Sequence, residues 1–301
     1  MPTPSAARGD YTYVDAEGVT IHYYVWRSGT PKAVVHLVHG LGEYATRYEQ
    51  FAQDLVAAGY AVYAADLRGH GQTGMQQYDG DASKLGKLGP GGVRATIAGV
   101  VQLSGIARFE HPRLPLVLLG HSLGSIFAQI ILNTYADLYD AAVLSGTPFR
   151  TLLHMNSGAL NKRFRHLGST GAEWLSRDPA VAPAFVADPL TFDAQAAKLF
   201  GILDGLRLLG RPTKLAKDLP LLIQIGSEDP LGGPRSVELL AAAYRKIGGL
   251  TDVTVDVYPG ARHEVYNETN REEVIGDLTT WLDEHVVGGH VGAGQVEDTS
   301  K

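Results

Sequence analysis

Short apolar segments alternate with segments of helical periodicity along most of the chain. The apolar segments are rich in β-branched and aromatic residues, which is typical of buried strands. We expect strands at residues 19–26, 33–38, 61–65, 114–119, 141–144, 221–225 and 253–257. We expect helices at residues 48–59, 92–107, 122–135, 236–247 and 274–285. Such alternation predicts parallel strands joined by helical crossovers, in a sheet that is covered on both faces.

One segment, residues 147–218, interrupts the alternation because its 72 residues contain no good strand. Five of its aliphatic residues share one helical face: Leu199, Ile202, Leu203, Leu206 and Leu209. We interpret the segment as a helical cap inserted between two strands, and we expect this face to pack inside the cap. The predicted domains are a core of residues 1–146 and 219–287, the cap at 147–218 and a flexible tail at 288–301.

Composition and charge narrow the classes of protein to consider. With 45% hydrophobic residues the chain can bury a large core, so wholesale disorder is excluded. A net charge of −6 argues against general nucleic-acid binding, which needs a basic surface. The charge is unevenly divided, because the cap segment carries +4 and the rest of the chain −10. The absence of cysteine excludes disulfides, thiol nucleophiles and thiolate metal sites.

A candidate nucleophile lies in Gly120-His121-Ser122-Leu123-Gly124, which fits the pattern G-x-S-x-G. The pattern directly follows an apolar strand and precedes a helical segment, as a nucleophile elbow requires. Such a sharp turn lifts the hydroxyl group of Ser122 above the sheet. The helix that follows also presents free N–H groups beside a developing anion. A plain glycine turn with a serine N-cap is the alternative.

A serine nucleophile needs a general base and a carboxylate that orients the base. His263 lies in the loop after the last predicted strand, at the edge of the sheet where sites form. The predicted strand before it runs into Glu228 and Asp229, which are both candidates for the carboxylate, and we prefer Asp229. The resulting order of serine, aspartate and histidine is that of α/β-hydrolases and differs from the chymotrypsin and subtilisin orders.

The loop His39-Gly40-Leu41-Gly42 follows the strand at 33–38. The anionic intermediate of acyl transfer needs two N–H donors held in place beforehand. We assign one donor to Leu123, the residue after the nucleophile, and the other to Leu41, whose flanking glycines let the backbone approach closely. Taken alone, this loop would be interpreted as an ordinary glycine turn at a strand end.

These motifs resemble those of α/β-hydrolases of the monoacylglycerol lipase and lysophospholipase branch. The matching segments are HGLGE at 39–43 with RY at 47–48, DLRGHG at 66–71, GHSLG at 120–124 and HEVYNE at 263–268. The resemblance extends from about residue 36 to residue 286. It implies a mostly parallel eight-stranded sheet flanked by helices, with a helical cap inserted after the sixth strand. It also implies the catalytic and oxyanion roles assigned above.

The chain departs from this family in two places near the matching motifs. Tyr44-Ala45-Thr46 follow Glu43 where the family commonly has a His-Ser pair, and Gln72-Thr73 follow Gly71 where a serine is usual. The cap segment matches only loosely. These differences bear on the substrate, because the cap shapes the acyl pocket, and they leave the catalytic assignment unchanged.

The sequence therefore predicts a serine hydrolase that cleaves carboxylic esters through an acyl-enzyme, with no metal or cofactor. Monoacylglycerols or similar single-chain, hydrophobic lipid esters are the expected substrates. The alternatives are an esterase or lactonase for a non-lipid molecule, an acyltransferase, and a non-catalytic ligand-binding protein. No signal peptide or spanning segment is visible, so we expect a cytoplasmic protein. Peripheral membrane contact through the cap and a homodimer stay open.

Overall fold

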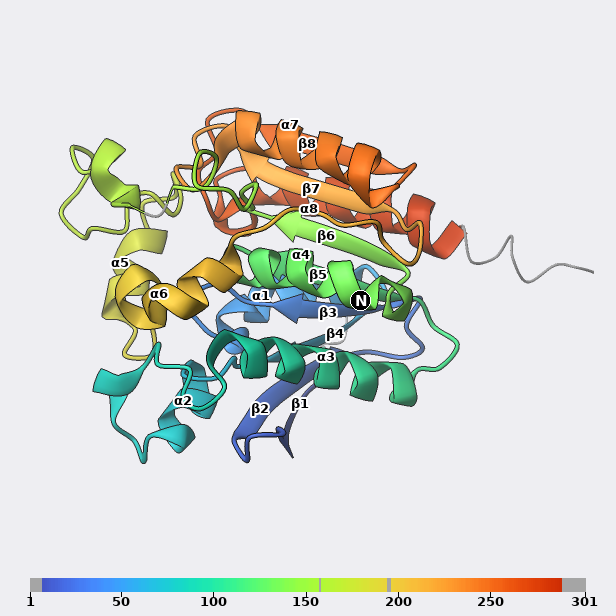
Figure 1. Ribbon diagram of the computed structural model, residues 1–301, viewed down its shortest axis with the longest axis horizontal. Coiled ribbons are helices and arrows are strands. Elements are labelled where there is room, and N and C mark those ends of the chain that lie inside the picture. Colours follow the sequence, from blue (N-terminus) through green and yellow to red (C-terminus); the bar gives the residue numbers. More distant parts are fainter. Residues whose placement is uncertain (1–6, 157, 194–195, 289–301) are drawn as a thin grey trace, which may run out of the picture.

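The computed structural model describes residues 7–156, 158–193 and 196–288, which build an eight-stranded sheet with helices on both faces (Figure 1). The strands are β1 (Ala7–Val14), β2 (Thr20–Arg27), β3 (Val34–Val38), β4 (Ala61–Ala65), β5 (Leu116–His121), β6 (Ala141–Ser145), β7 (Leu221–Gly226) and β8 (Val253–Tyr258). They lie in the order β1-β2-β4-β3-β5-β6-β7-β8. β2 is antiparallel to β1 and to β4, and all other neighbouring strands are parallel. The predicted mostly parallel, eight-stranded sheet is confirmed.

The hydrophobic pattern did not locate β1. This strand lies at the edge of the sheet and pairs only with β2. Most of its residues are exposed, so its sequence contains no apolar run. Every residue of β3, β4 and β6 is buried, by contrast, and these strands were predicted correctly. A pattern of apolar residues reveals strands that helices cover, and it misses one that faces water.

A layer of helices covers each face of the sheet. Successive residues of a strand point to opposite faces, so one strand can pack against both layers. The helices are α1 (Glu49–Ala57), α2 (Gly71–Gln77), α3 (Gly92–Glu110), α4 (Leu123–Tyr135), α5 (Val181–Ala187), α6 (Ala196–Leu208), α7 (Gly233–Ala243) and α8 (Arg271–Leu282). One core cluster joins Val34 and Val38 of β3 to α3, α4 and α7. The other joins Val35 and Leu37 of the same strand to α1 and α8. Alternate residues of one strand therefore anchor both layers.

The segment between β6 and β7 holds α5, α6 and the short turn η4 (Leu160–Arg163), and its described residues form no strand. Figure 1 shows α5 and α6 beyond the carboxyl ends of the central strands, on the left of the view. The segments that follow the parallel strands β3, β5, β7 and β8 begin at this same edge of the sheet. The predicted helical segment thus faces the loops that carry the candidate catalytic residues.

The expectation that the aliphatic face of residues 199–209 packs inside the cap is wrong for its central residues. Ile202, Leu203 and Leu206 are 82%, 73% and 58% exposed. The physical reason is a break at Gly201, where φ is 62° and ψ is −170°, so no single helical phase runs through α6. The chain instead buries Phe200, just before the break. The tail at 288–301 lies outside the described residues except for its first residue.

Candidate active site

Ser122 joins β5 to α4 in a strained backbone conformation. Its φ of 54° and ψ of −118° lie outside the helical and extended regions, a conformation that costs about 1–3 kcal/mol and needs support from its surroundings. Gly124 provides part of that support, since a Cβ atom there would lie 2.0 Å from the carbonyl oxygen of Val38. The N–H of Ser122 donates to the carbonyl of Ser145 in β6 at 3.0 Å. This turn has the geometry of the predicted nucleophile elbow.

His263 and Asp229 form a buried pair in the loops after β8 and β7. Nδ1 of His263 lies 2.9 Å from Oδ2 of Asp229, while Oδ1 of Asp229 accepts the N–H of Leu231 at 2.8 Å. A carboxylate only accepts hydrogen bonds, so Nδ1 carries the proton and Nε2 is left as an acceptor. Nε2 is buried and has no hydrogen-bond partner among the described residues. A histidine in this state can take a proton from a nearby hydroxyl group.

The surroundings of His263 favour its protonated form. Burial lowers the pKa of His263, but the charge and hydrogen bond of Asp229, together with Glu264 and Glu43, raise this pKa above its usual value. The ring of Trp174 covers the imidazole, with ring centres 4.7 Å apart. An imidazolium ion formed during a reaction is therefore stabilised by buried carboxylates.

Glu228, the other candidate carboxylate, points elsewhere. It forms an ion pair with Arg163 of η4, and both side chains are partly exposed. The structure thus brings Asp229, and not Glu228, to the imidazole of His263.

The loop that carries Leu41 packs against the nucleophile. A Cβ atom on Gly40 would lie 3.0 Å from the Cβ of Ser122. Nδ1–H of His39 donates to the carbonyl of Gly40 at 2.7 Å, and Nε2 of His39 accepts the N–H of Leu67 at 2.9 Å. Since Nε2 accepts, the ring is neutral, and burial holds the pKa of His39 well below its usual value. A fixed neutral imidazole therefore anchors this loop.

Leu123, the other predicted donor, is the first residue of α4. An N–H group in the first turn of a helix has no acceptor within the helix, so it is free to bind an anion. Both predicted donors thus lie on backbone segments next to Ser122.

Three charged residues of the family motifs, Glu43, Arg47 and Glu264, were given no role in the sequence-based prediction. Glu43 binds Arg47 at 2.8 Å, and Arg47 binds both carboxylate oxygens of Glu264 at 2.7 and 2.8 Å. All three side chains are largely buried beside the loops of Leu41 and His263. Their signal was a charged residue at a fixed place in each motif. Glu43 and Arg47 are only four positions apart, but Arg47 and Glu264 are 217 positions apart and could not be paired by inspection.

The cap segment contacts the loop of Leu41 directly. The hydroxyl group of Tyr44 donates to Oδ2 of Asp188 at 2.5 Å, and the N–H of Phe192 donates to the carbonyl of Gly42 at 3.1 Å. Both contacts join this loop to the stretch that follows α5. The position of the cap is thereby linked to that of the loop.

The cap segment is also joined to the loop of His263. Arg177 binds the buried carboxylate of Glu268 at 2.8 Å, and the side chain of Ser176 donates to the carbonyl of Asn267 at 2.8 Å. Arg262 donates to the carbonyls of Glu173 and Ser176 at 2.6 and 2.7 Å. These contacts hold the cap residues next to Trp174 against the candidate base.

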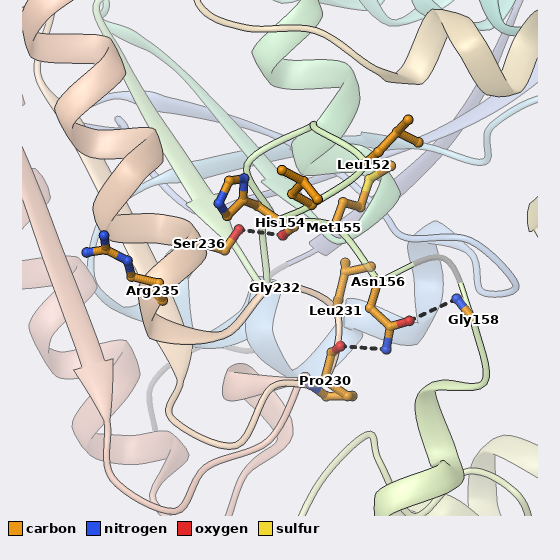
Figure 2. A pocket seen from close by; sticks show the side chains of 11 residues that line it. Leu152, His154, Met155, Asn156, Gly158, Pro230, Leu231, Gly232, Arg235 and Ser236 are labelled. Atoms are coloured by element: carbon orange, nitrogen blue, oxygen red, sulfur yellow. Dashed lines mark hydrogen bonds between the residues drawn. The ribbon is translucent and has the colours of Figure 1, made fainter.

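A hollow of about 420 Å³ lies between the start of the cap segment and the loop that follows β7. Figure 2 shows Leu152 and Met155 on one side and Pro230 and Leu231 on the other, with Arg235 at the beginning of α7. Neither Ser122 nor His263 lines it. It therefore adjoins the loop of Asp229 without forming part of the candidate catalytic centre.

Within the part of the chain that the structure describes, no group of histidine and acidic residues could hold a metal ion. None of the described helices is long and apolar enough to cross a membrane.

A parallel sheet with a serine elbow after β5, an aspartate after β7 and a histidine after β8 defines an α/β-hydrolase. The family described as "Serine aminopeptidase, S33" matches residues 29–270, and the chain belongs to this family. The predicted α/β-hydrolase of the monoacylglycerol lipase branch is thereby confirmed, as is its class, a carboxylic ester hydrolase.

Relatives and solved structures agree with this placement. A monoacylglycerol lipase of Mycolicibacterium smegmatis is 33% identical over 299 residues, which cover 94% of this chain and 99% of the relative. A monoglyceride lipase of Homo sapiens is 28% identical, over 89% of this chain and 88% of the relative. The crystal structure of a thermostable carboxyl esterase from Bacillus coagulans, in complex with glycerol, superimposes with a TM-score of 0.81. It is 22% identical and covers 93% of this chain and 99% of its own, which shows the shared fold.

Proposed function

We propose that the protein hydrolyses monoacylglycerols or similar single-chain lipid esters, with Ser122 as nucleophile, His263 as base and Asp229 as the residue that orients the base. The buried pair of His263 and Asp229 carries the proposal. Nε2 of His263 has no hydrogen-bond partner among the described residues, and it lies at the same edge of the sheet as the strained Ser122. A strained serine and an oriented neutral imidazole are what acyl transfer requires.

The reaction proceeds in two halves. Nε2 of His263 takes the proton of Ser122 as Oγ attacks the ester carbonyl carbon, and the N–H groups of Leu41 and Leu123 bind the oxyanion. Collapse of the intermediate breaks the bond to the alcohol, which leaves with the proton from His263. Water then attacks the acyl-enzyme by the same route and releases the fatty acid, which regenerates Ser122.

Two observations favour lipid monoesters over other esters. A monoacylglycerol lipase and a monoglyceride lipase align with 94% and 89% of this chain. The cap segment also brings Phe192 over the loop of Leu41, with its ring 5.4 Å from that of His70, so apolar groups lie beside the oxyanion side of the site. A non-lipid ester, a lactone, a peptide amide and acyl transfer to an alcohol are the competing uses of the same residues.

A substrate panel tests the proposal. Purified protein and Ser122→Ala are assayed on 1- and 2-monoacylglycerols of several chain lengths, a short-chain aryl ester, a macrocyclic lactone and an aminoacyl amide. We expect the highest kcat/KM on a monoacylglycerol and no turnover by Ser122→Ala. A preference for the lactone or the amide would show that the proposed substrate is wrong, although the protein would still be a serine hydrolase.

The cap, which we take to be residues 147–218 between core segments 1–146 and 219–287, is the part that meets a lipid surface. It carries +4 and many of the exposed large apolar side chains, including Leu152, Leu153, Ile202, Leu203 and Leu206. Sedimentation with anionic phospholipid vesicles tests this contact. Ile202→Ser with Leu203→Ser should weaken binding, whereas Phe109→Ser, which removes an exposed ring from α3, should not.

A homodimer stays a prediction. Light scattering tests it directly, because a dimer has twice the 32.2 kDa mass of the chain.

A further inference from the structure

We propose that Glu43 is a positioning residue. Its buried carboxylate fixes the position of the loop of Leu41 relative to the loop of His263. This inference deepens the proposed function and rests on it, because it assigns Glu43 to the geometry of that reaction. Glu43 touches neither the nucleophile nor the base through a hydrogen bond, so it acts through the residues it binds.

Glu43 holds the backbone just before the proposed oxyanion donor. Its Oε1 accepts the N–H of Gly40 at 2.6 Å and the hydroxyl group of Tyr48 at 2.7 Å. A Cβ atom on Gly40 would lie 2.6 Å from this oxygen and 3.0 Å from the Cβ of Ser122, so Gly40 lies between the carboxylate and the nucleophile. Glycine is the most flexible residue, and an unrestrained Gly40 would let the loop move.

The hydrogen bonds of Glu43 and His39 together fix both peptide planes at Gly40. Glu43 binds the N–H in the plane before this residue, and His39 binds the carbonyl in the plane after it. In a trans peptide the carbonyl of Gly40 and the N–H of Leu41 point in opposite directions within one plane. Holding that carbonyl therefore aims the N–H of Leu41, which is the preorganisation that an oxyanion site needs.

Arg47 extends this restraint to the loop of the base. Its Nη1 binds Oε2 of Glu43 at 2.8 Å, and its two terminal nitrogens bind the two oxygens of Glu264 at 2.7 and 2.8 Å. Glu264 follows His263 directly in the chain. The planar fork of arginine sets both distance and angle in such a pair, so the two loops are locked together across the site.

The same carboxylate acts on the base electrostatically. Asp229, Glu264 and Glu43 act on the charge of His263, and His121 lies beside its ring. Arg47 binds both Glu43 and Glu264. The three hydrogen-bond partners of Glu43 are all donors and favour its ionised form, whereas burial and the charge of Glu264 raise the pKa of Glu43 above its usual value. Its negative charge helps to raise the pKa of His263, so removing the charge should lower this pKa. A purely structural role for Glu43 would leave the pKa of the base unchanged.

The test uses Glu43→Ala, Glu43→Gln and the control Asp15→Ala. Asp15 is also buried, binds an arginine (Arg68) at 2.8 Å and accepts two backbone N–H groups, but it lies at the turn between β1 and β2. We expect Glu43→Ala to lower kcat about 100-fold with KM changed less than about threefold, because small displacements of oriented groups cost about that much. Asp15→Ala should keep kcat even though its Tm falls.

Glu43→Gln separates the two effects. Its amide oxygen can still accept the N–H of Gly40, so most of the kcat lost in Glu43→Ala should return. Without the negative charge, the acidic limb of the kcat/KM profile should move to lower pH. An unmoved limb, a Glu43→Ala enzyme with wild-type kcat, or an equal loss in Asp15→Ala would overturn the inference. If Glu43→Ala does not fold, the position of the acidic limb of the kcat/KM profile of Glu43→Gln tests the inference. A wild-type protein that hydrolyses no ester would instead overturn the proposed function.

Discussion

The hydroxyl group of Tyr44, in the loop between β3 and η1 (Ala45–Tyr48), donates to the carboxylate of Asp188 at the end of α5, 2.5 Å away. The two residues are 144 positions apart in the chain, and their hydrogen bond joins the cap to the oxyanion side of the site. Next to it, the N–H of Phe192 donates to the carbonyl of Gly42 at 3.1 Å. Opening of the cap on this side requires both bonds to break.

Tyr44→Phe should loosen this contact. Loss of one hydrogen bond to a carboxylate costs about 1.5–3 kcal/mol, so the amide of Phe192 should exchange with solvent deuterium faster. Hydrogen exchange followed by mass spectrometry measures this. Tyr78→Phe, which removes a tyrosine hydroxyl bound to the carbonyl of Lys87, is the control and should leave the cap peptides unchanged. Unchanged exchange of Phe192 in Tyr44→Phe would show that the cap is held by other contacts.

The two acidic residues after β7 should respond differently to removal of their charge. Asp229→Asn should lower kcat by about 10⁴-fold with the fold intact, because the amide favours the wrong tautomer of the base. Glu228→Gln loses only a partly exposed ion pair with Arg163, so its kcat should stay close to that of the wild type. Steady-state kinetics on one ester decides between them. The reverse ranking would mean that Glu228 orients His263.

The pH profile should report the state of His263. The base works only when neutral, and its pKa lies above the usual value of 6.5 because nearby carboxylates outweigh burial. Activity should therefore fall as the pH decreases through this raised pKa, and kcat/KM should reach its plateau only above it. The measurement is kcat/KM from pH 4 to 10 on an uncharged ester. A limb with a midpoint below 6.5 would contradict the raised pKa.

Much of this architecture follows from local patterns in the sequence. Buried strands such as β3 and β6 are uninterrupted apolar runs, and Gly120 and Gly124 mark the elbow around Ser122 because its turn excludes side chains. The exposed edge strand β1 and the break at Gly201 escaped prediction. The first has no apolar run, and the second changes the helical phase of a segment that otherwise looks continuous.

Among the contacts between distant loops, the sequence predicted only those of Ser122, Asp229 and His263, whose order in the chain is that of a known triad. The choice between Asp229 and Glu228 depends on how the loop after β7 turns, which the alternation of apolar residues does not determine. Arg47 and Glu264 are 217 positions apart, and charged residues of this kind are more often solvated than paired. The motifs located the candidate catalytic residues, whereas the residues that hold them emerge only from the fold.

The close approach of α4 to β3 should make Gly124 irreplaceable. Gly124→Ala places a methyl group against the carbonyl of Val38 and should destabilise the fold by about 3 kcal/mol. Gly276→Ala is the matched control, because a methyl group on this exposed glycine of α8 would meet no atom within 4 Å. Alanine at that position should stabilise the helix by about 0.5–1 kcal/mol. Urea denaturation measures both. An unchanged free energy of unfolding in Gly124→Ala would mean that α4 can move away from β3 without loss of stability.

The proposed mechanism depends on Ser122 as the nucleophile, and covalent labelling shows which serine reacts. The wild-type protein and Ser122→Ala are treated with a fluorophosphonate that reacts with activated serines, and the adducts are measured by intact mass and peptide mapping. We expect one adduct on the wild type, located on Ser122, and none on Ser122→Ala. Equal labelling of both proteins, or an adduct on another residue of the wild type, would contradict it.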